Sequence, residues 1–182
     1  MSFASVSGNP ALDLAATVGS RRGDAFDLLS TPTDLERWVD GCANLPDGVH
    51  ADDASFATAL TLREAIYELA LDRVRERRFD ADALATVNAS ANGPLPTLSL
   101  TDKGAQTSGN LAAVLTQLAR DAVTVLGDSD AILKECSRPE CTRIYLDRSC
   151  GSRRTWCGMD ECGNRVKAAA YRARRRSAAR DA

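Results

Sequence analysis

Two pairs of cysteines with the same spacing constrain this chain of 182 residues more than any other feature of its sequence. Cys136 and Cys141 are separated by four residues, and Cys157 and Cys162 repeat that spacing near the C-terminus. Zinc prefers four ligands in a tetrahedral arrangement, and two short loops that each supply two thiolates meet that requirement. The segment 142–156, which separates the pairs, has the length of a small hairpin that would bring them together. We therefore predict that these four cysteines bind one Zn²⁺ ion.

The predicted zinc site is closed and structural. Four thiolates fill a tetrahedral site and leave no open position, which a catalytic zinc would need. The only histidine, His50, lies far upstream, and Cys150 fits neither pair, so we expect a free thiol at Cys150. Cys42 is expected to be a small residue of the core or of a loop. A disulfide framework, an iron–sulfur cluster and a redox dithiol are the alternatives for the clustered cysteines.

Charge is distributed unevenly along the chain. Residues 1–133 contain 10 Lys or Arg against 19 Asp or Glu, whereas residues 134–182 contain 13 against 6. An acidic body with a basic end is expected when only the end meets a polyanion. Because the basic residues adjoin the predicted metal site, we favour nucleic acid as their partner over a merely solvated charged tail.

The residues after Cys162 predict a basic helix. Asn164 is expected to cap it, and Val166, Ala170 and Ala173 form a narrow apolar stripe that would lie on the finger. Several arginines on one helix can neutralise phosphates and can contact guanine edges in a major groove. The nucleic-acid-binding residues that we predict around the second cysteine pair and on this helix are Arg153, Arg154, Arg165, Lys167, Arg172, Arg174, Arg175 and Arg176.

The first 130 residues show mainly helical patterns. Apolar spacing and capping residues predict helices in the segments 9–18, 31–41, 53–77, 81–92 and 111–127. Thr31 or Thr33 would cap the second of these helices, the latter in a capping box with Glu36. A hairpin that turns at 102–104 is expected to interrupt the helices, with Pro96 limiting its first strand to an edge or a late start.

These patterns predict a mainly α, α+β fold with two parts. Residues 1–130 would form a helical domain with a small β-hairpin. Residues 131–182 would form a treble-clef-like four-cysteine zinc finger with a basic C-terminal helix, entered through a helical turn in 128–136. No apolar run approaches the ~18–20 residues that span a bilayer, and no signal peptide is visible, so we expect a cytoplasmic protein with no membrane partner. No nucleophile–base pair, phosphate loop or open metal site is visible, so we expect no catalysis.

The run RRTWCGMDECGNRVKAAAYRARRR closely resembles the CGNR zinc finger, which is named for the four residues that stand here at 162–165. The pair Cys136 and Cys141, the strand at 144–147 and the Trp-Cys step at 156–157 also follow that family's pattern. The front of the chain, LDLAATVGSRRG followed by DLLSTPTDLERWV and LREAIYELAL, is similar to the ABATE domain that precedes this finger in stress-induced transcription regulators. Together the two resemblances cover nearly all of the chain.

The resemblance implies a zinc-dependent transcription regulator that binds double-stranded DNA. Ala16 stands where the family's LDFVNT-like motif tends to have Asn, and Thr155 stands where the family often has a cation. If that Asn lines a ligand pocket, this chain has lost one polar group there. The departure at Thr155 slightly reduces the basic surface.

An acidic helical part joined to a basic finger suggests a ligand-sensing domain joined to a nucleic-acid-binding module. Asp13, Thr17, Arg21 and Arg63 are the residues that we would expect in a pocket for a small-molecule effector, since Asp13 and Thr17 share a helix face. A structural ion pair of Asp13 or Arg63 is the alternative. Two other functions compete with DNA binding: a zinc-stapled module for RNA or protein, and a small-molecule-binding protein or enzyme with an accessory finger. The oligomeric state is open, and a homodimer is one alternative.

Overall fold

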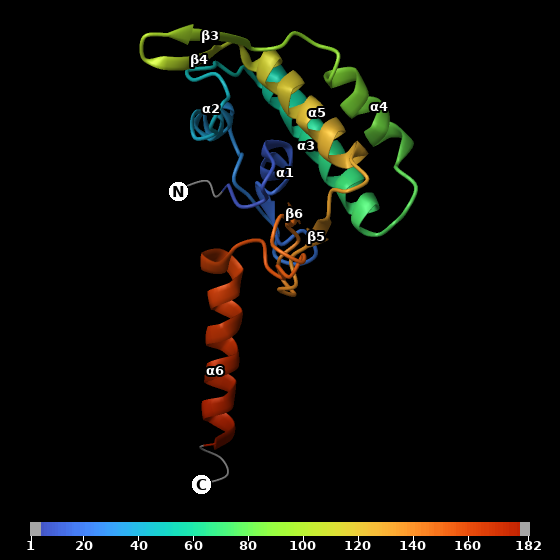
Figure 1. The fold of residues 1–182 in the computed structure, drawn as a ribbon, viewed down its shortest axis with the longest axis vertical. Helices are drawn as coiled ribbons and strands as arrows, with labels where there is room; N and C mark the ends of the chain where they lie inside the picture. The colour runs from blue at the N-terminus through green and yellow to red at the C-terminus, as the bar shows by residue number, and fades with distance from the viewer. Residues whose placement is uncertain (1–4, 179–182) are drawn as a thin grey trace.

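Helices form nearly half of the protein, and small two-stranded sheets lie between them along the chain (Figure 1). The computed structural model describes residues 5–178, without the side chains at 161, 173, 175, 177 and 178. The helices are α1 (Pro10–Ala15), α2 (Pro32–Asp40), α3 (Asp53–Val74), α4 (Ala81–Ser90), α5 (Leu111–Gly127) and α6 (Asn164–Ala178), with a π-helical turn, η1 (Met159–Gly163), before α6. The antiparallel strand pairs are β1 (Val18–Gly19) with β2 (Phe26–Asp27), β3 (Thr97–Thr101) with β4 (Gly104–Ser108), and β5 (Leu133–Glu135) with β6 (Ile144–Leu146). The predicted mixed α+β class is therefore confirmed.

The long helices α3 and α5 lie side by side, and α4 and α1 pack against them (Figure 1). Leu62, Ile66 and Leu69 follow helical spacing and form the buried face of α3. Val114 and Leu118 occupy the equivalent face of α5. The bounds of α5 agree with the predicted segment 111–127, because its apolar stripe is regular. No helix in the described part of the chain is long and apolar enough to cross a membrane.

Side-chain caps set where the first helices begin. The Asn9 side chain accepts a hydrogen bond from the backbone N–H of Ala11 at 2.9 Å, as the predicted cap of α1. Thr31, and not Thr33, caps α2 and forms a capping box with Asp34. The predicted box with Glu36 is therefore wrong. Glu36 instead accepts a hydrogen bond from the backbone N–H of Ala51 at 2.8 Å and fixes the connection that leads to α3.

The strands near the first cysteine pair differ from the prediction. The expected helical turn in 128–136 is wrong, because Leu133–Glu135 form the strand β5. This strand pairs with β6, with Lys134 opposite Tyr145, so the hairpin encloses the first cysteine pair. The expected hairpin within 142–156 is therefore also wrong. Apolar side chains explain the change, since Leu133 and Leu146 are partners in this hairpin and both contact the core beside α3.

The zinc-finger hairpin shares the core of the helical part. Ile144 and Leu146 are buried and belong to the same apolar cluster as the faces of α3 and α5. The backbone N–H of Leu146 donates a hydrogen bond to the carbonyl of Ser7 at 2.8 Å, and Arg22 forms an ion pair with Glu135 at 2.5 Å. The division at residues 130 and 131 stays a prediction, and the packing is continuous across it.

Replacing Ile144 with Ala tests this continuity. Removing a buried Ile side chain costs roughly 2–5 kcal/mol of unfolding free energy, and the loss should lower the stability of the helices and of the finger together. Thermal unfolding of the zinc-loaded protein, followed by circular dichroism and by zinc release, should give one coincident transition shifted to lower temperature. The matched control is Val123→Ala, because Val123 is 43 % exposed on α5 and its substitution should shift the transition far less. Two separate transitions in the unsubstituted protein would contradict a shared core.

Candidate metal centre

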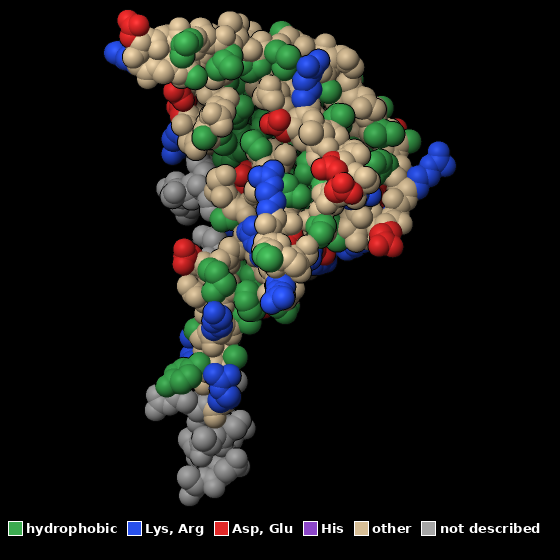
Figure 2. Space-filling view, in the orientation of Figure 1, with side chains coloured by type: hydrophobic (Ala, Val, Ile, Leu, Met, Phe, Trp, Pro, Cys, Tyr) green, Lys and Arg blue, Asp and Glu red, His purple; other side chains and the backbone are tan. Residues whose placement is uncertain are grey.

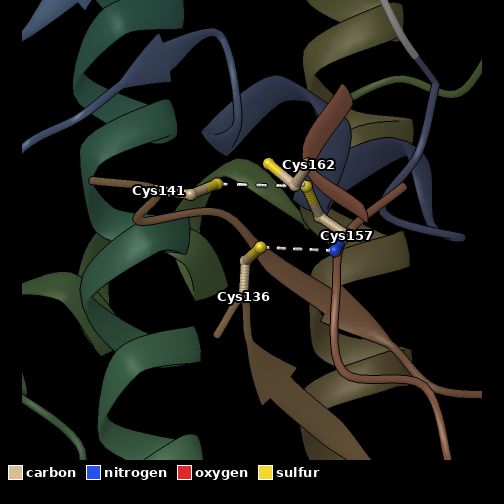
Figure 3. A group of neighbouring side chains, drawn as sticks. All are labelled: Cys136, Cys141, Cys157 and Cys162. Carbon is tan, nitrogen blue, oxygen red and sulfur yellow. Dashed lines mark hydrogen bonds between the residues drawn. The ribbon is translucent and has the colours of Figure 1, made fainter. Parts of the chain in front are cut away.

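The four paired cysteines converge from three pieces of chain (Figure 3). Cys136 follows β5 and Cys141 precedes β6, so the hairpin holds the first pair at its turn. Cys157 lies in the loop after β6, and Cys162 lies in the turn η1 that continues into α6. The arrangement of a hairpin turn, a loop and the start of a helix has the treble-clef-like form that we predicted.

The geometry of the four sulfur atoms fits a tetrahedral zinc ion. All four lie within 4.8 Å of one another, and the Sγ atom of Cys157 lies 3.6 Å from that of Cys162 and 3.9 Å from that of Cys141. A tetrahedron with Zn–S bonds of 2.3 Å requires sulfur atoms about 3.8 Å apart. All four side chains are buried, which leaves no room for a substrate. The residues present therefore fit a closed site, and the protein binds zinc through Cys136, Cys141, Cys157 and Cys162.

Proximity changes the acidity of these thiols. Hydrogen bonds from Cys141 and Cys157 lower the pKa of Cys136 well below its usual range. The same contact with Cys136 raises the pKa of Cys141 to about 12, and contacts with Cys136 and Cys141 raise the pKa of Cys157 strongly. The physical cause is that several thiolates cannot share one small volume without a cation. Zinc binding at neutral pH must therefore displace protons from Cys141 and Cys157.

Two donors from the protein point at sulfur atoms of the site. The backbone N–H of Cys157 lies 3.5 Å from the Sγ atom of Cys136, as the dashed line in Figure 3 shows. The Arg138 guanidinium lies 3.8 Å from the Sγ atom of Cys162 and also forms an ion pair with Glu140. Because four thiolates and one Zn²⁺ leave a net negative charge, such donors stabilise the ligands in their ionised form.

A buried polar network holds the chain around the metal site. The Lys134 ammonium donates a hydrogen bond to the Asp147 carboxylate at 2.7 Å. This bond, with two more from Ser149, lowers the pKa of Asp147 well below its usual range. The Tyr145 hydroxyl donates to the carbonyl of Arg154 at 2.8 Å, and burial raises its pKa to about 12. The Asp147 carboxylate thus stays ionised, and its ion pair with Lys134 ties β5 to the loop that leads to Cys157.

Arg154 has a structural role that differs from the predicted contact with nucleic acid. Its guanidinium donates hydrogen bonds to the carbonyls of Val6, at 2.6 Å, and of Cys157, and its Nε donates to the carbonyl of Trp156 at 2.8 Å. It also lies 4.4 Å from the centre of the Tyr145 ring. These contacts use the guanidinium to join the N-terminal segment to the metal loop, so we leave Arg154 out of the DNA-binding surface.

The turn η1 explains two residues of the CGNR motif. A Cβ atom at Gly163 would lie 2.7 Å from the Met159 sulfur and 3.3 Å from the Trp156 ring, so glycine allows the turn to close over the metal site. Asn164 has helical backbone angles, and its side chain donates to the Asp160 carboxylate at 3.3 Å. The predicted capping role of Asn164 is therefore wrong. The helix continues from η1 without a break, so Asn164 is not an N-cap.

Helix α6 leaves the metal site and extends away from the rest of the protein (Figure 1). The predicted apolar stripe does not lie on the finger, because Val166 is only half-buried and Ala170 is exposed, while the side chain of Ala173 lies outside the described ones. The side chain of Arg175 is likewise outside the described ones. The other predicted basic residues of this surface are all exposed: Arg153, Arg165, Lys167, Arg172, Arg174 and Arg176.

The remaining cysteines lie outside the sulfur cluster. Cys150 is exposed in the loop after β6, and Cys42 is half-buried beside the helical core. Both are free thiols. Burial raises the pKa of Cys42 to about 12. These positions agree with the expectation that neither residue is a zinc ligand.

The four residues predicted for an effector pocket do not form one group. The Asp13 carboxylate accepts hydrogen bonds from the backbone N–H groups of Val6 and Ser7, at 3.0 and 2.8 Å, and so fixes the N-terminal segment. Arg63 forms two hydrogen bonds with Asp27, at 2.7 and 2.8 Å. The contact of Asp13 with Ser7 also supports the segment that pairs with Leu146 of the finger.

Thr17 and Arg21 lie near Arg63. The Thr17 hydroxyl donates to the carbonyl of Leu14 at 2.7 Å and accepts from Arg63 at 3.4 Å. Arg21 forms an ion pair with Glu64 and lies 3.9 Å from the centre of the Tyr67 ring. The backbone N–H of Arg21 also donates to the Thr142 hydroxyl of the finger at 3.2 Å. Thr17, Arg21 and Arg63 therefore form an internal polar network that adjoins the finger.

Comparison with known protein families covers almost the whole chain. Residues 8–129 match the ABATE model, whose description is "Putative stress-induced transcription regulator". The chain belongs to the ABATE family. Residues 133–175 match the CGNR zinc finger, which confirms the predicted second family. A search of the curated proteins found no match.

These matches agree with the metal site and leave the finer function open. Neither family is described as an enzyme. The CGNR match spans the hairpin β5–β6, all four clustered cysteines and most of α6. The ABATE match ends between α5 and β5, although the core of this ABATE protein continues into β6. The protein is thus a zinc-binding member of the ABATE family.

Substituting one ligand tests the metal site. Cys157→Ser removes a thiolate from a fully buried position and should reduce zinc to well below one equivalent per chain, as measured by elemental analysis. Cys150→Ser is the matched control, because Cys150 is exposed and outside the cluster, and it should retain the full zinc content. Equal zinc in both variants would contradict the four-cysteine site.

Zinc affinity should fall as the pH is lowered. Protons compete with zinc for the thiolates, and the raised pKa values of Cys141 and Cys157 mean that both are protonated in the metal-free site at neutral pH. Calorimetric titration with zinc in two buffers of different ionisation enthalpy should therefore show proton release. Zinc binding that neither releases protons nor weakens with acid would contradict this assignment.

Proposed function

We propose that the protein regulates transcription by binding double-stranded DNA through α6. The observation that carries the proposal is the position of α6, which starts at the metal site and projects from the protein. All of its described side chains are exposed except that of Val166, which is half-buried. A helix held in this way can enter a major groove without hindrance from its own domain. The ABATE match supports a role in transcription.

The charge of α6 suits a polyanion. The segment 164–178 contains Arg165, Lys167 and four further arginines, and it contains no Asp or Glu. Figure 2 shows basic side chains along the described part of this helix. Exposed arginines contribute little to folding, so their concentration on one projecting element favours binding of phosphates.

A small cavity at the start of α6 adds positive charge to this surface. It has a volume of about 120 Å³ and lies between the finger and the β1–β2 hairpin, with Arg138, Arg143 and Arg165 among its lining residues. Ser20 from the front part of the chain completes its wall. A DNA phosphate that reached this cavity would contact the finger and the front part at once.

The shared core supports a regulatory role for the front part. Ile144 and Leu146 pack in the same cluster as the long helices, and the backbone of Arg21 bonds to Thr142. A ligand or partner that shifts α3 would therefore also shift the hairpin that carries the metal site. We propose that signals reach α6 by this route, through packing and not through a flexible linker.

The test measures DNA affinity at several salt concentrations. Arg172, Arg174 and Arg176 are replaced with Ala together, and binding to mixed-sequence duplex DNA is followed by fluorescence anisotropy. Each lost phosphate contact should reduce the slope of log K against log salt by about 0.9, so the triple variant should lose roughly 2–3 from the slope. Zinc content should not change, because these side chains are exposed and distant from the cysteines along the helix.

A matched control removes the same charge elsewhere. Arg75, Arg78 and Lys103 are exposed in the front part of the chain, and their triple Ala variant should bind DNA as the unsubstituted protein does. Equal weakening by both variants would show that net charge, and not α6, attracts DNA. Equal affinity for duplex DNA and single-stranded RNA would favour the alternative of an RNA-binding module and would contradict the proposal.

A further inference from the structure

The β3–β4 hairpin is an exposed sheet of only two strands. It projects from the helices at the end of the molecule opposite α6 (Figure 1). Nine of its ten strand residues are exposed, and Thr107 is half-buried. An isolated two-stranded hairpin is only marginally stable in water, and three or more strands are normally needed. The structure therefore presents a sheet that gains stability from another strand.

One face of the hairpin is apolar. Side chains alternate between the faces of a strand, so Leu98 and Leu100 lie on the same face, opposite Thr107 and Ala105 of β4. Leu98 is 72 % exposed and Leu100 is 89 % exposed. Figure 2 shows hydrophobic side chains at this end of the molecule. Two leucines so exposed on adjacent positions of one face indicate a contact surface more than random surface composition.

The outer edge of β3 is open and unprotected. Residues of β4, together with Leu98 of β3, line a cleft of about 990 Å³ whose other wall is the loop after α2. The edge of β4 lies toward α2, whereas the edge of β3 lies on the outer side of the hairpin (Figure 1). Natural edge strands are commonly blocked by Lys, Pro or a bulge within the strand. The β3 segment Thr97–Thr101 contains no charge and no proline, and its pairing with β4 shows no bulge.

We propose that β3 pairs with β3 of a second copy of this chain, antiparallel and centred on Ser99. In this register Leu98 of each chain stands opposite Leu100 of the other, so four leucines form one cluster on the apolar face. The two-residue turn at 102–103 makes Thr101 and Gly104 a hydrogen-bonded pair. Hydrogen-bonded and non-hydrogen-bonded pairs alternate along an antiparallel ladder, so the backbone N–H and C=O groups of Leu98 and Leu100 point away from β4 and toward the open edge of β3. The same two residues thus supply both the hydrogen bonds and the apolar contact.

Charge and sequence favour a second copy as the occupant. Because the strand is uncharged, antiparallel self-pairing brings no like charges together, and the tip residues Asp102 and Lys103 fall outside the paired positions. A pairing centred on Ser99 is the same for both chains, as an interface on a twofold axis requires. Strands of five residues bury less than the about 800 Å² per partner of a standard interface, so the dimer is weak, with a Kd on the order of 10–100 µM.

Sedimentation velocity over a range of protein concentration tests the proposal with the zinc-loaded full chain. The unsubstituted protein should shift from monomer to dimer. The variant L98K/L100K places Lys opposite Lys at both leucine pairs and should raise the Kd by about tenfold or more. The variant L98K/L100E places Lys opposite Glu in the same register and should dimerise more strongly than L98K/L100K.

A matched control adds the same two charges away from the hairpin. Leu84 and Val123 are partly exposed on α4 and α5, and L84K/V123K should dimerise like the unsubstituted protein. Circular dichroism and zinc content check that every variant is folded. A chain that stays monomeric up to about 1 mM would overturn the proposal, and so would a dimer that responds equally to L98K/L100K and L84K/V123K. A dimer that is weakened equally by L98K/L100K and L98K/L100E would overturn the proposed register. These readouts need no DNA, so they are independent of the proposed function.

Discussion

Four sulfur atoms within 4.8 Å of one another need a cation between them. Without it, most of the thiols must keep their protons, and the hydrogen bonds of Lys134, Tyr145 and Arg154 hold only the loop that leads to Cys157. With it, one ion joins the end of β5, the start of β6, the loop at Cys157 and the turn at Cys162. The glycine at 163 fits the same constraint, because it lets the turn approach Trp156.

The metal site alone does not set the direction of α6 relative to the helices. That direction depends on where the β5–β6 hairpin is anchored, and the anchor is the apolar contact of Ile144 and Leu146 with the core. Polar contacts reinforce it from the front of the chain, through Ser7, Arg21 and Arg22. The projecting helix is therefore connected to α3 through buried side chains, the hairpin and the metal. This chain of contacts is the physical basis for the regulation that we propose for the front part.

The sequence predicted best those features that depend on local spacing. Metal ligation is one of them, because two C-x4-C pairs define the ligands whatever the fold around them. The regular stripe of α5 is another. The strand β5 could not be predicted, because Leu133–Glu135 is too short to show a period and acquires its structure by pairing with β6. Thr31 was one of the two predicted caps of α2, but the predicted capping box of Thr33 with Glu36 was wrong for a similar reason, since Glu36 accepts a hydrogen bond from the backbone N–H of Ala51.

Long-range contacts limited the prediction of site residues. Arg154 resembles its exposed neighbour Arg153 in sequence, yet it binds the carbonyl of Val6, which is 148 residues away along the chain. Nothing local distinguishes the two arginines. Asp13 and Arg63 were equally ambiguous, because the sequence does not show that their partners are the backbone N–H of Ser7 and the Asp27 carboxylate. The roles of arginines and carboxylates depend on their neighbours in the folded protein. The spacing of the four cysteines, by contrast, already identifies them as metal ligands in the sequence.

The burial of Ile144 and Leu146 also bears on how such regulators diversify. Many zinc fingers are cassettes that can be exchanged between proteins by recombination at a linker. Here an exchanged finger would bring two side chains that must fit a foreign helical interior, and a poor fit would unfold both halves. The DNA specificity that we propose for α6 would therefore change more easily by substitutions along the exposed helix than by transplanting the finger. Engineers who wish to retarget this protein should graft α6 alone, with the join placed after Gly163.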